Sequence, residues 1–187
     1  MRKRPLSDKG ISKTSGFTLI EVIMAIVVMA IISVGVGSLL YQGTRSFEMM
    51  DTRRDLTGQG KLAMERMTRE IRLTRCVSGG GACTPSATEI TAMTADEIRF
   101  VKQDYEGRGF RYDATAQTLY LRQGSTATDP EDILARNVSA FAFGYFKSNG
   151  TAATLQAQVW RVTAEMTLSS GAESIDFKAS IYPRHFY

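Results

Sequence analysis

The chain has 187 residues, 43% of them hydrophobic and 22% charged, which suits one folded domain with an accessory segment and excludes collagen-like, coiled-coil and wholly disordered chains. One His and two Cys are too few for a multi-ligand zinc site or a His-dependent catalytic triad. The net charge of +4 belongs to residues 1–16, which hold five basic side chains and one acidic one. The remainder is neutral, so the charge does not indicate nucleic-acid binding.

A long apolar run follows this basic leader. Residues 22–40 are 19 residues without a charge, and about 20 apolar residues suffice to cross a bilayer as a helix. The basic residues before the run favour a cytoplasmic N-terminus. Gly35, Gly37 and Ser38 would also suit the small-residue cleavage site of an ordinary secretory signal, so that alternative stays open.

One carboxylate, Glu21, stands at the start of the apolar segment. Placing a carboxylate in a membrane helix costs about 3 kcal/mol, and more without a partner. Two interpretations follow. Either the side chain reaches back to the cytoplasmic interface, or it pairs with a positive charge inside the membrane.

Glu21 and the five residues before it form a recognisable motif, Gly16-Phe17-Thr18-Leu19-Ile20-Glu21. With its short basic leader and following apolar run, it resembles the processing motif of type IV pilins and type II secretion pseudopilins. The resemblance implies that a prepilin peptidase cuts between Gly16 and Phe17 and methylates the new Phe17 amine. It also implies that this amine pairs with Glu21 of a neighbouring subunit, because two buried opposite charges then neutralise each other.

The middle of the apolar run departs from the major subunits of this family. Major pilins generally carry a Pro where this chain has Ser38, and the departure favours a minor subunit. Gly35 and Gly37 either weaken the helix there, at about 1 kcal/mol each relative to Ala, or let neighbouring helices approach closely.

Residues 45–75 continue as an amphipathic helix by pattern. An apolar stripe at helical spacing predicts packing against a sheet; it consists of Leu56, Ala63, Met67 and Ile71. Gly58 and Gly60 predict a bend. Four basic residues recur every three positions and, because Glu65 and Glu70 interleave with them, predict a solvated face rather than a nucleic-acid site; they are Arg66, Arg69, Arg72 and Arg75.

Cys76 and Cys83 enclose six residues just past this helix. A periplasmic location is oxidising and favours a disulfide, and the short loop can satisfy the bridge geometry. The spacing is not the C-x-x-C of a redox-active pair. We therefore predict a structural disulfide.

After Pro85 the apolar pattern changes to a period of two. The alternating segments, separated by turn residues, are 96–102, 110–113, 118–123, 137–147, 160–168 and 174–182. They predict an antiparallel meander of five or six strands with one apolar face. One helix laid across such a sheet gives an α+β fold.

The predicted organisation has four parts: a leader that is removed (1–16), a transmembrane and filament-core helix (17–44), an amphipathic helix that packs on the head (45–75) and a β-rich periplasmic head (76–187). This order of helix, cysteine loop and strands resembles the minor pilins and the J-type pseudopilins in its pattern.

Motifs for catalysis, cofactors or metals are not found in the sequence. The run Asp129-Pro130-Glu131-Asp132 lacks the alternating spacing and glycine of a calcium loop, so it predicts the start of a helix or strand before Ile133, with calcium binding as the alternative. His185 has no partner motif and is assigned to a surface or interface. We expect no enzyme activity, no cofactor and no metal.

The leading hypothesis is a minor type IV pilin that helps to initiate or cap pilus assembly. The alternatives are a J-type pseudopilin of a type II secretion system and, from another class, a signal-anchored periplasmic binding or sensory domain that keeps its leader. The expected partners are a prepilin peptidase and methyltransferase, other pilins or pseudopilins, the inner-membrane assembly platform and the inner membrane. The chain would first sit in that membrane with its N-terminus cytoplasmic and its head periplasmic, and then near the tip of a pilus or pseudopilus.

Overall fold

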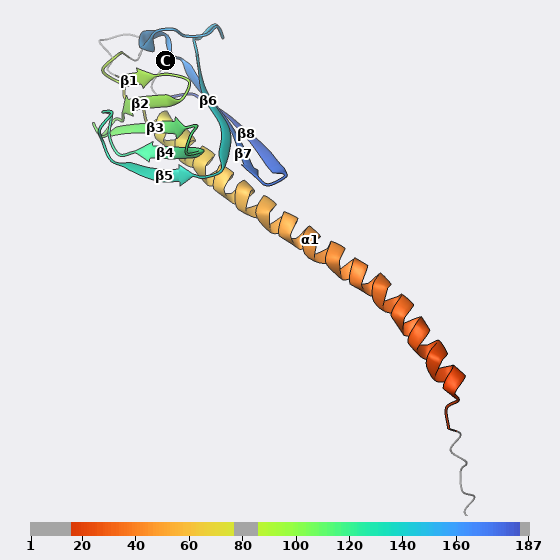
Figure 1. The fold of residues 1–187 in the computed structure, drawn as a ribbon. Helices are drawn as coiled ribbons and strands as arrows, with labels where there is room; N and C mark the ends of the chain where they lie inside the picture. Colours follow the sequence, from red (N-terminus) through yellow and green to blue (C-terminus); the bar gives the residue numbers. More distant parts are fainter. Residues whose placement is uncertain (1–15, 77–85, 184–187) are drawn as a thin grey trace, which may run out of the picture. The chain divides into compact units, whose positions relative to one another are not determined.

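The computed structural model describes residues 16–76 and 86–183. The chain divides into two compact units, Met1–Phe47 and Glu48–Tyr187. The described part contains one α-helix, α1 (Leu19–Arg72), which begins in the first unit and ends in the second (Figure 1). All eight strands in the described part belong to the second unit.

In the first unit, α1 begins at Leu19, and the carbonyl of Thr18 accepts hydrogen bonds from the amides of Glu21 (3.1 Å) and Val22 (3.3 Å). The large apolar side chains of this unit are exposed. Within the described residues, α1 is the helix long and apolar enough to cross a membrane, with a mean hydropathy of 2.8 over its most apolar window. Because so much apolar surface is unfavourable in water, this segment needs lipid or other helices around it.

In the second unit, one face of α1 is buried, as the apolar stripe of the sequence predicts. The stripe residues Leu56, Ala63, Met67 and Ile71 are all buried. α1 continues without interruption through Gly58 and Gly60, and the predicted bend there stays a prediction. A Cβ atom on Gly60 would lie 2.2 Å from the ring of Phe177, so this glycine makes room for an aromatic ring.

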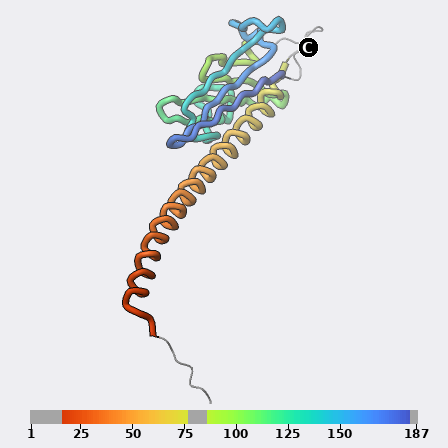
Figure 2. The backbone as a smooth tube through the Cα atoms, turned by 90° about the vertical axis from the view of Figure 1, so that its right-hand side faces the viewer, coloured from red at the N-terminus to blue at the C-terminus, as the bar shows by residue number. Residues whose placement is uncertain are grey.

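The strands form two antiparallel sheets rather than the single meander that the sequence predicted (Figure 1). The five-stranded sheet has the order β1 (Ile90–Met93), β2 (Glu97–Val101), β3 (Gly107–Asp113), β4 (Thr118–Arg122) and β5 (Glu131–Ala135). The three-stranded sheet, whose long strands lie side by side in Figure 2, has the order β6 (Val138–Phe146), β7 (Arg161–Ser170) and β8 (Glu173–Ile181). A short 3₁₀ helix, η1 (Gln156–Gln158), precedes β7.

The division into two sheets occurs at the link between β5 and β6. Asn137 adopts a left-handed conformation there, with φ of 59°, which an extended ladder does not accommodate. The chain therefore leaves the first sheet, and β6 pairs with β7 instead. The run Asp129-Pro130-Glu131-Asp132 leads into β5, which confirms its predicted role in starting a strand.

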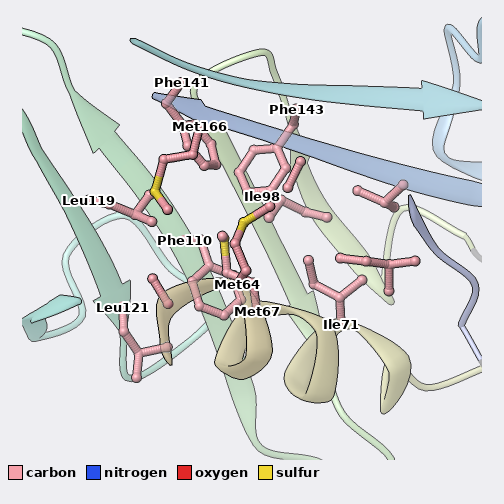
Figure 3. Packing of buried hydrophobic residues seen from close by; sticks show 14 of the residues in the cluster. Met64, Met67, Ile71, Ile98, Phe110, Leu119, Leu121, Phe141, Phe143 and Met166 are labelled. Atoms are coloured by element: carbon pink, nitrogen blue, oxygen red, sulfur yellow. The ribbon is translucent and has the colours of Figure 1, made fainter. Parts of the chain in front are cut away.

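One hydrophobic core joins α1 to both sheets. Met64 and Met67 of the helix lie beside Phe110 of the first sheet, Ile71 lies further along the helix, and Phe143 of the second sheet lies across from them (Figure 3). The two sheets are also tied by Tyr145, whose hydroxyl donates to the carbonyl of Thr94 at 2.8 Å. Burial raises the pKa of this tyrosine and keeps the hydroxyl as a donor.

The end of α1 pairs with the end of β2. The helix stops at Arg72, three residues earlier than expected. Thr74 then forms a bridge with Lys102, and the amide of Arg75 donates to the carbonyl of Val101 at 2.8 Å. Strand-like pairing therefore replaces the last predicted helical turn.

The outer face of the five-stranded sheet carries ion pairs between its strands. Arg111 on β3 donates to both carboxylate oxygens of Glu131 on β5, at 2.9 and 2.8 Å. Arg122 on β4 also pairs with Glu131. These contacts, the hydrogen bonds from Arg111 foremost, hold the pKa of Glu131 below its ordinary value of 4.5.

We expect the Glu131→Gln substitution to weaken the head at neutral pH and to make its stability less sensitive to acid. A carboxyl whose pKa is lowered by folding stabilises the fold above its ordinary pKa, and this contribution is lost as the pH falls through the lowered value. The gap in melting temperature between wild type and variant should therefore be largest at pH 7 and shrink below about pH 4.5. This gap in melting temperature is measured by circular dichroism melts of the full chain in detergent. Glu65→Gln, at an exposed carboxylate without an ion pair in the described part, is the control. A gap that stays constant with pH would contradict this account.

Candidate functional site

The predicted cleavage site lies in the short segment that precedes α1. Gly16 and Phe17 are in neither a helix nor a strand, and Phe17 is 82% exposed. The position of a Cβ on Gly16 has no neighbouring atom within 4 Å. A protease binds accessible backbone outside regular structure, and the peptide bond between Gly16 and Phe17 meets that requirement. The leader residues 1–15 lie outside the described residues.

Glu21 is exposed in the first turn of α1, four residues after Phe17. The two residues line the same shallow hollow, whose other walls are the apolar side chains of Val22, Ala25, Ile26 and Met29. The positive end of the helix dipole favours a carboxylate at this position. Within the described residues Glu21 makes no ion pair.

The other predicted site residues are described only in part. Cys76 is half-buried just after the end of α1, but Cys83 lies outside the described residues, so their disulfide stays a prediction. His185 also lies outside them. Among the residues that the structure describes, no group of His, Cys, Asp or Glu is arranged to hold a metal ion.

Asp129 belongs to the run for which calcium binding was the alternative. Its carboxylate is hydrogen-bonded within its own loop. It accepts a hydrogen bond from the amide of Thr126 at 2.7 Å. This backbone contact lowers the pKa of Asp129. The observed role of this carboxylate is to hold the loop that connects β4 to β5.

The row of four arginines at the end of α1 and just after it, Arg66, Arg69, Arg72 and Arg75, is not the uniform solvated face that the sequence predicted. Glu70 is buried, at 6% exposure, and its carboxylate lies 2.9 Å from Nε of Arg66. The guanidinium of Arg75 lies 4.0 Å from the ring centre of Tyr105. The other two members of the row, Arg69 and Arg72, are exposed as predicted. This division could not be predicted from the neighbouring residues, because Tyr105 lies on a turn far away in the sequence.

Residues 11–37 match the family model described as the prokaryotic N-terminal methylation motif. This motif is the prepilin-type signal of type IV pilins and pseudopilins, and the long helix with its antiparallel sheets is a pilin-like α+β architecture. The chain thus carries the signal of a type IV pilin-like or pseudopilin precursor. The comparison with curated proteins finds no match.

The motif has consequences for the processing and placement of the chain. It implies processing by a prepilin peptidase and assembly with other pilins. The apolar part of α1, near the N-terminus, indicates the single-pass membrane anchoring that is typical of pilins. Proteins with this motif are structural subunits rather than enzymes.

Proposed function

We propose that this chain is a minor type IV pilin, a non-catalytic subunit that helps to initiate or cap pilus assembly. Its leader is removed between Gly16 and Phe17, the Phe17 amine is methylated, and Glu21 guides the helix into the filament. The observation that carries the proposal is the methylation motif at residues 11–37, together with a carboxylate in the first turn of an apolar helix that has no ion pair within the described residues.

The charges at Phe17 and Glu21 explain why cleavage precedes assembly. Before cleavage, the residue at position 17 is an uncharged amide within the chain, and Glu21 makes no ion pair with any residue that the structure describes. Cleavage converts that amide into an amine that stays protonated near neutral pH. Only a processed subunit can then offer a cation to Glu21 of its neighbour. The pair lowers the cost of holding each charge in an apolar environment, so assembly depends on processing.

Processing is expected to leave a mature chain that begins with methylated Phe17. Intact-mass and peptide mass spectrometry of the chain from a host that has the peptidase should find Phe17 at the N-terminus with one added methyl group. The same chain from a peptidase-deficient strain, the control, should keep its leader. An intact leader in both hosts would favour the signal-anchored periplasmic domain.

A J-type pseudopilin of a type II secretion system is the second candidate, because the methylation motif is common to pilins and pseudopilins. A deletion strain separates the two when surface pili and secreted proteins are scored in one culture. Loss of pili with normal secretion is expected for a minor pilin. Normal pili with proteins trapped in the periplasm would instead identify a pseudopilin, and no change in either would contradict both.

A further inference from the structure

A groove runs between α1 and the last strand of the five-stranded sheet. It has a volume of about 320 Å³ and is lined by Leu62, Glu65, Arg66, Arg69, Leu121 and Leu134. Resting on the proposed function, we propose that this groove binds an extended, acidic segment of another subunit of the same filament. All of the lining residues belong to the second unit, Glu48–Tyr187.

The apolar part of the groove is incompletely covered. Leu121 closes the bottom and is buried, whereas Leu134 on β5 is half-buried and Leu62 on α1 is 69% exposed. Such a large exposed leucine beside a hollow is unfavourable in water, and an apolar side chain inserted between Leu62 and Leu134 would shield both.

The strand beside the groove has a free edge. β5 is the last strand of its sheet, and within the described residues its backbone forms no hydrogen bond with any segment except β4. Glu131 and Asp132 protect the first half of this edge with charge. The second half begins with Ile133, which is exposed and apolar. An extended segment can add to such an edge through its backbone while its alternate side chains enter the groove.

The charges beside the groove favour an acidic partner. Arg66 is already paired with Glu70. Arg69 lines the groove and Arg72 stands one turn further along α1, and neither makes an ion pair in the described part of the chain. Among the α1 residues beside the groove, two guanidinium groups without an ion pair in the described part therefore accompany one such carboxylate, that of Glu65. Carboxylates on the incoming segment would pair with the arginines, which fixes register and orientation.

Site-specific photocrosslinking in the full chain tests the proposal. Leu62 is replaced by p-benzoylphenylalanine in the native host, and irradiated filaments are sheared off and analysed by mass spectrometry. The expected adduct joins position 62 to a carboxylate-containing segment of a subunit that carries the methylation motif. The matched control places the same photoprobe at Leu155, which is also exposed but lies outside the groove, and should not give that adduct.

Charge reversal then tests the role of the arginines. In the Arg69→Glu/Arg72→Glu variant the adduct should fall about tenfold, because two ion pairs become like-charge contacts. The control variant Arg54→Glu/Lys147→Glu has the same change in net charge outside the groove and should keep the adduct. An adduct that is unchanged by reversal, an adduct with phospholipid, or none at all would overturn the groove proposal. Absence of the wild-type chain from filaments would instead overturn the proposed function.

Discussion

The Glu21→Ala substitution is expected to reduce the chain in purified filaments by about 100-fold or more, because losing one partner of a buried ion pair costs about 3–5 kcal/mol. Its level in the membrane should not fall. The substitution removes a carboxylate that costs about 3 kcal/mol in a membrane helix, so the isolated subunit becomes easier to hold in lipid. Immunoblots of sheared filaments and of membranes from the same cells measure both quantities.

Ser33→Ala is the matched control for this experiment. Ser33 lies on the same exposed part of α1, and its hydroxyl donates to the carbonyl of Met29 at 2.7 Å within the helix. Losing that bond leaves the pairing of Glu21 unchanged, so the control should enter filaments normally. If Glu21→Ala enters filaments at the wild-type level, Glu21 has no part in assembly and its proposed pairing with the Phe17 amine is wrong.

The N-terminal features could be predicted from the sequence because they are local. The processing motif and the apolar run are contiguous, and the family model covers the same stretch of chain, residues 11–37. The apolar stripe of α1 could also be predicted, because its burial depends only on which face of the helix meets the head. Its residues are Leu56, Ala63, Met67 and Ile71. The α+β class followed from the change in apolar period.

The split into two sheets could not be predicted, because it depends on short or unusual segments. β1 has only four residues, and β5 begins among carboxylates that resemble a turn. Asn137, which turns the chain away from the first sheet, is a residue that tolerates a left-handed conformation but does not require it. The closeness of Gly60 to Phe177 could not be predicted for a related reason, because Phe177 comes from the last strand.

The Phe110→Ala substitution is expected to lower the free energy of unfolding of the head by about 3–5 kcal/mol. Phe110 is fully buried on β3, where it lies among the helix side chains of the core (Figure 3) and 6.2 Å from the ring of Phe100. Removing the Phe110 side chain leaves a cavity. Helix α1 and the two sheets cannot move in to fill it, because each is held by its own hydrogen bonds. This loss is a large part of the about 5–15 kcal/mol by which domains are normally stable.

Denaturant unfolding of the full chain in detergent, followed by circular dichroism, measures this change. The control is Leu155→Ala, at an exposed leucine outside the core, which should shift stability by less than about 0.5 kcal/mol. A loss below about 1 kcal/mol for Phe110→Ala would contradict the shared core. The N-terminus of Phe110→Ala should still be cleaved and methylated, because the motif at residues 11–37 precedes every residue of the head. Phe110→Ala therefore weakens folding and leaves processing unchanged, whereas Glu21→Ala weakens assembly and leaves folding unchanged.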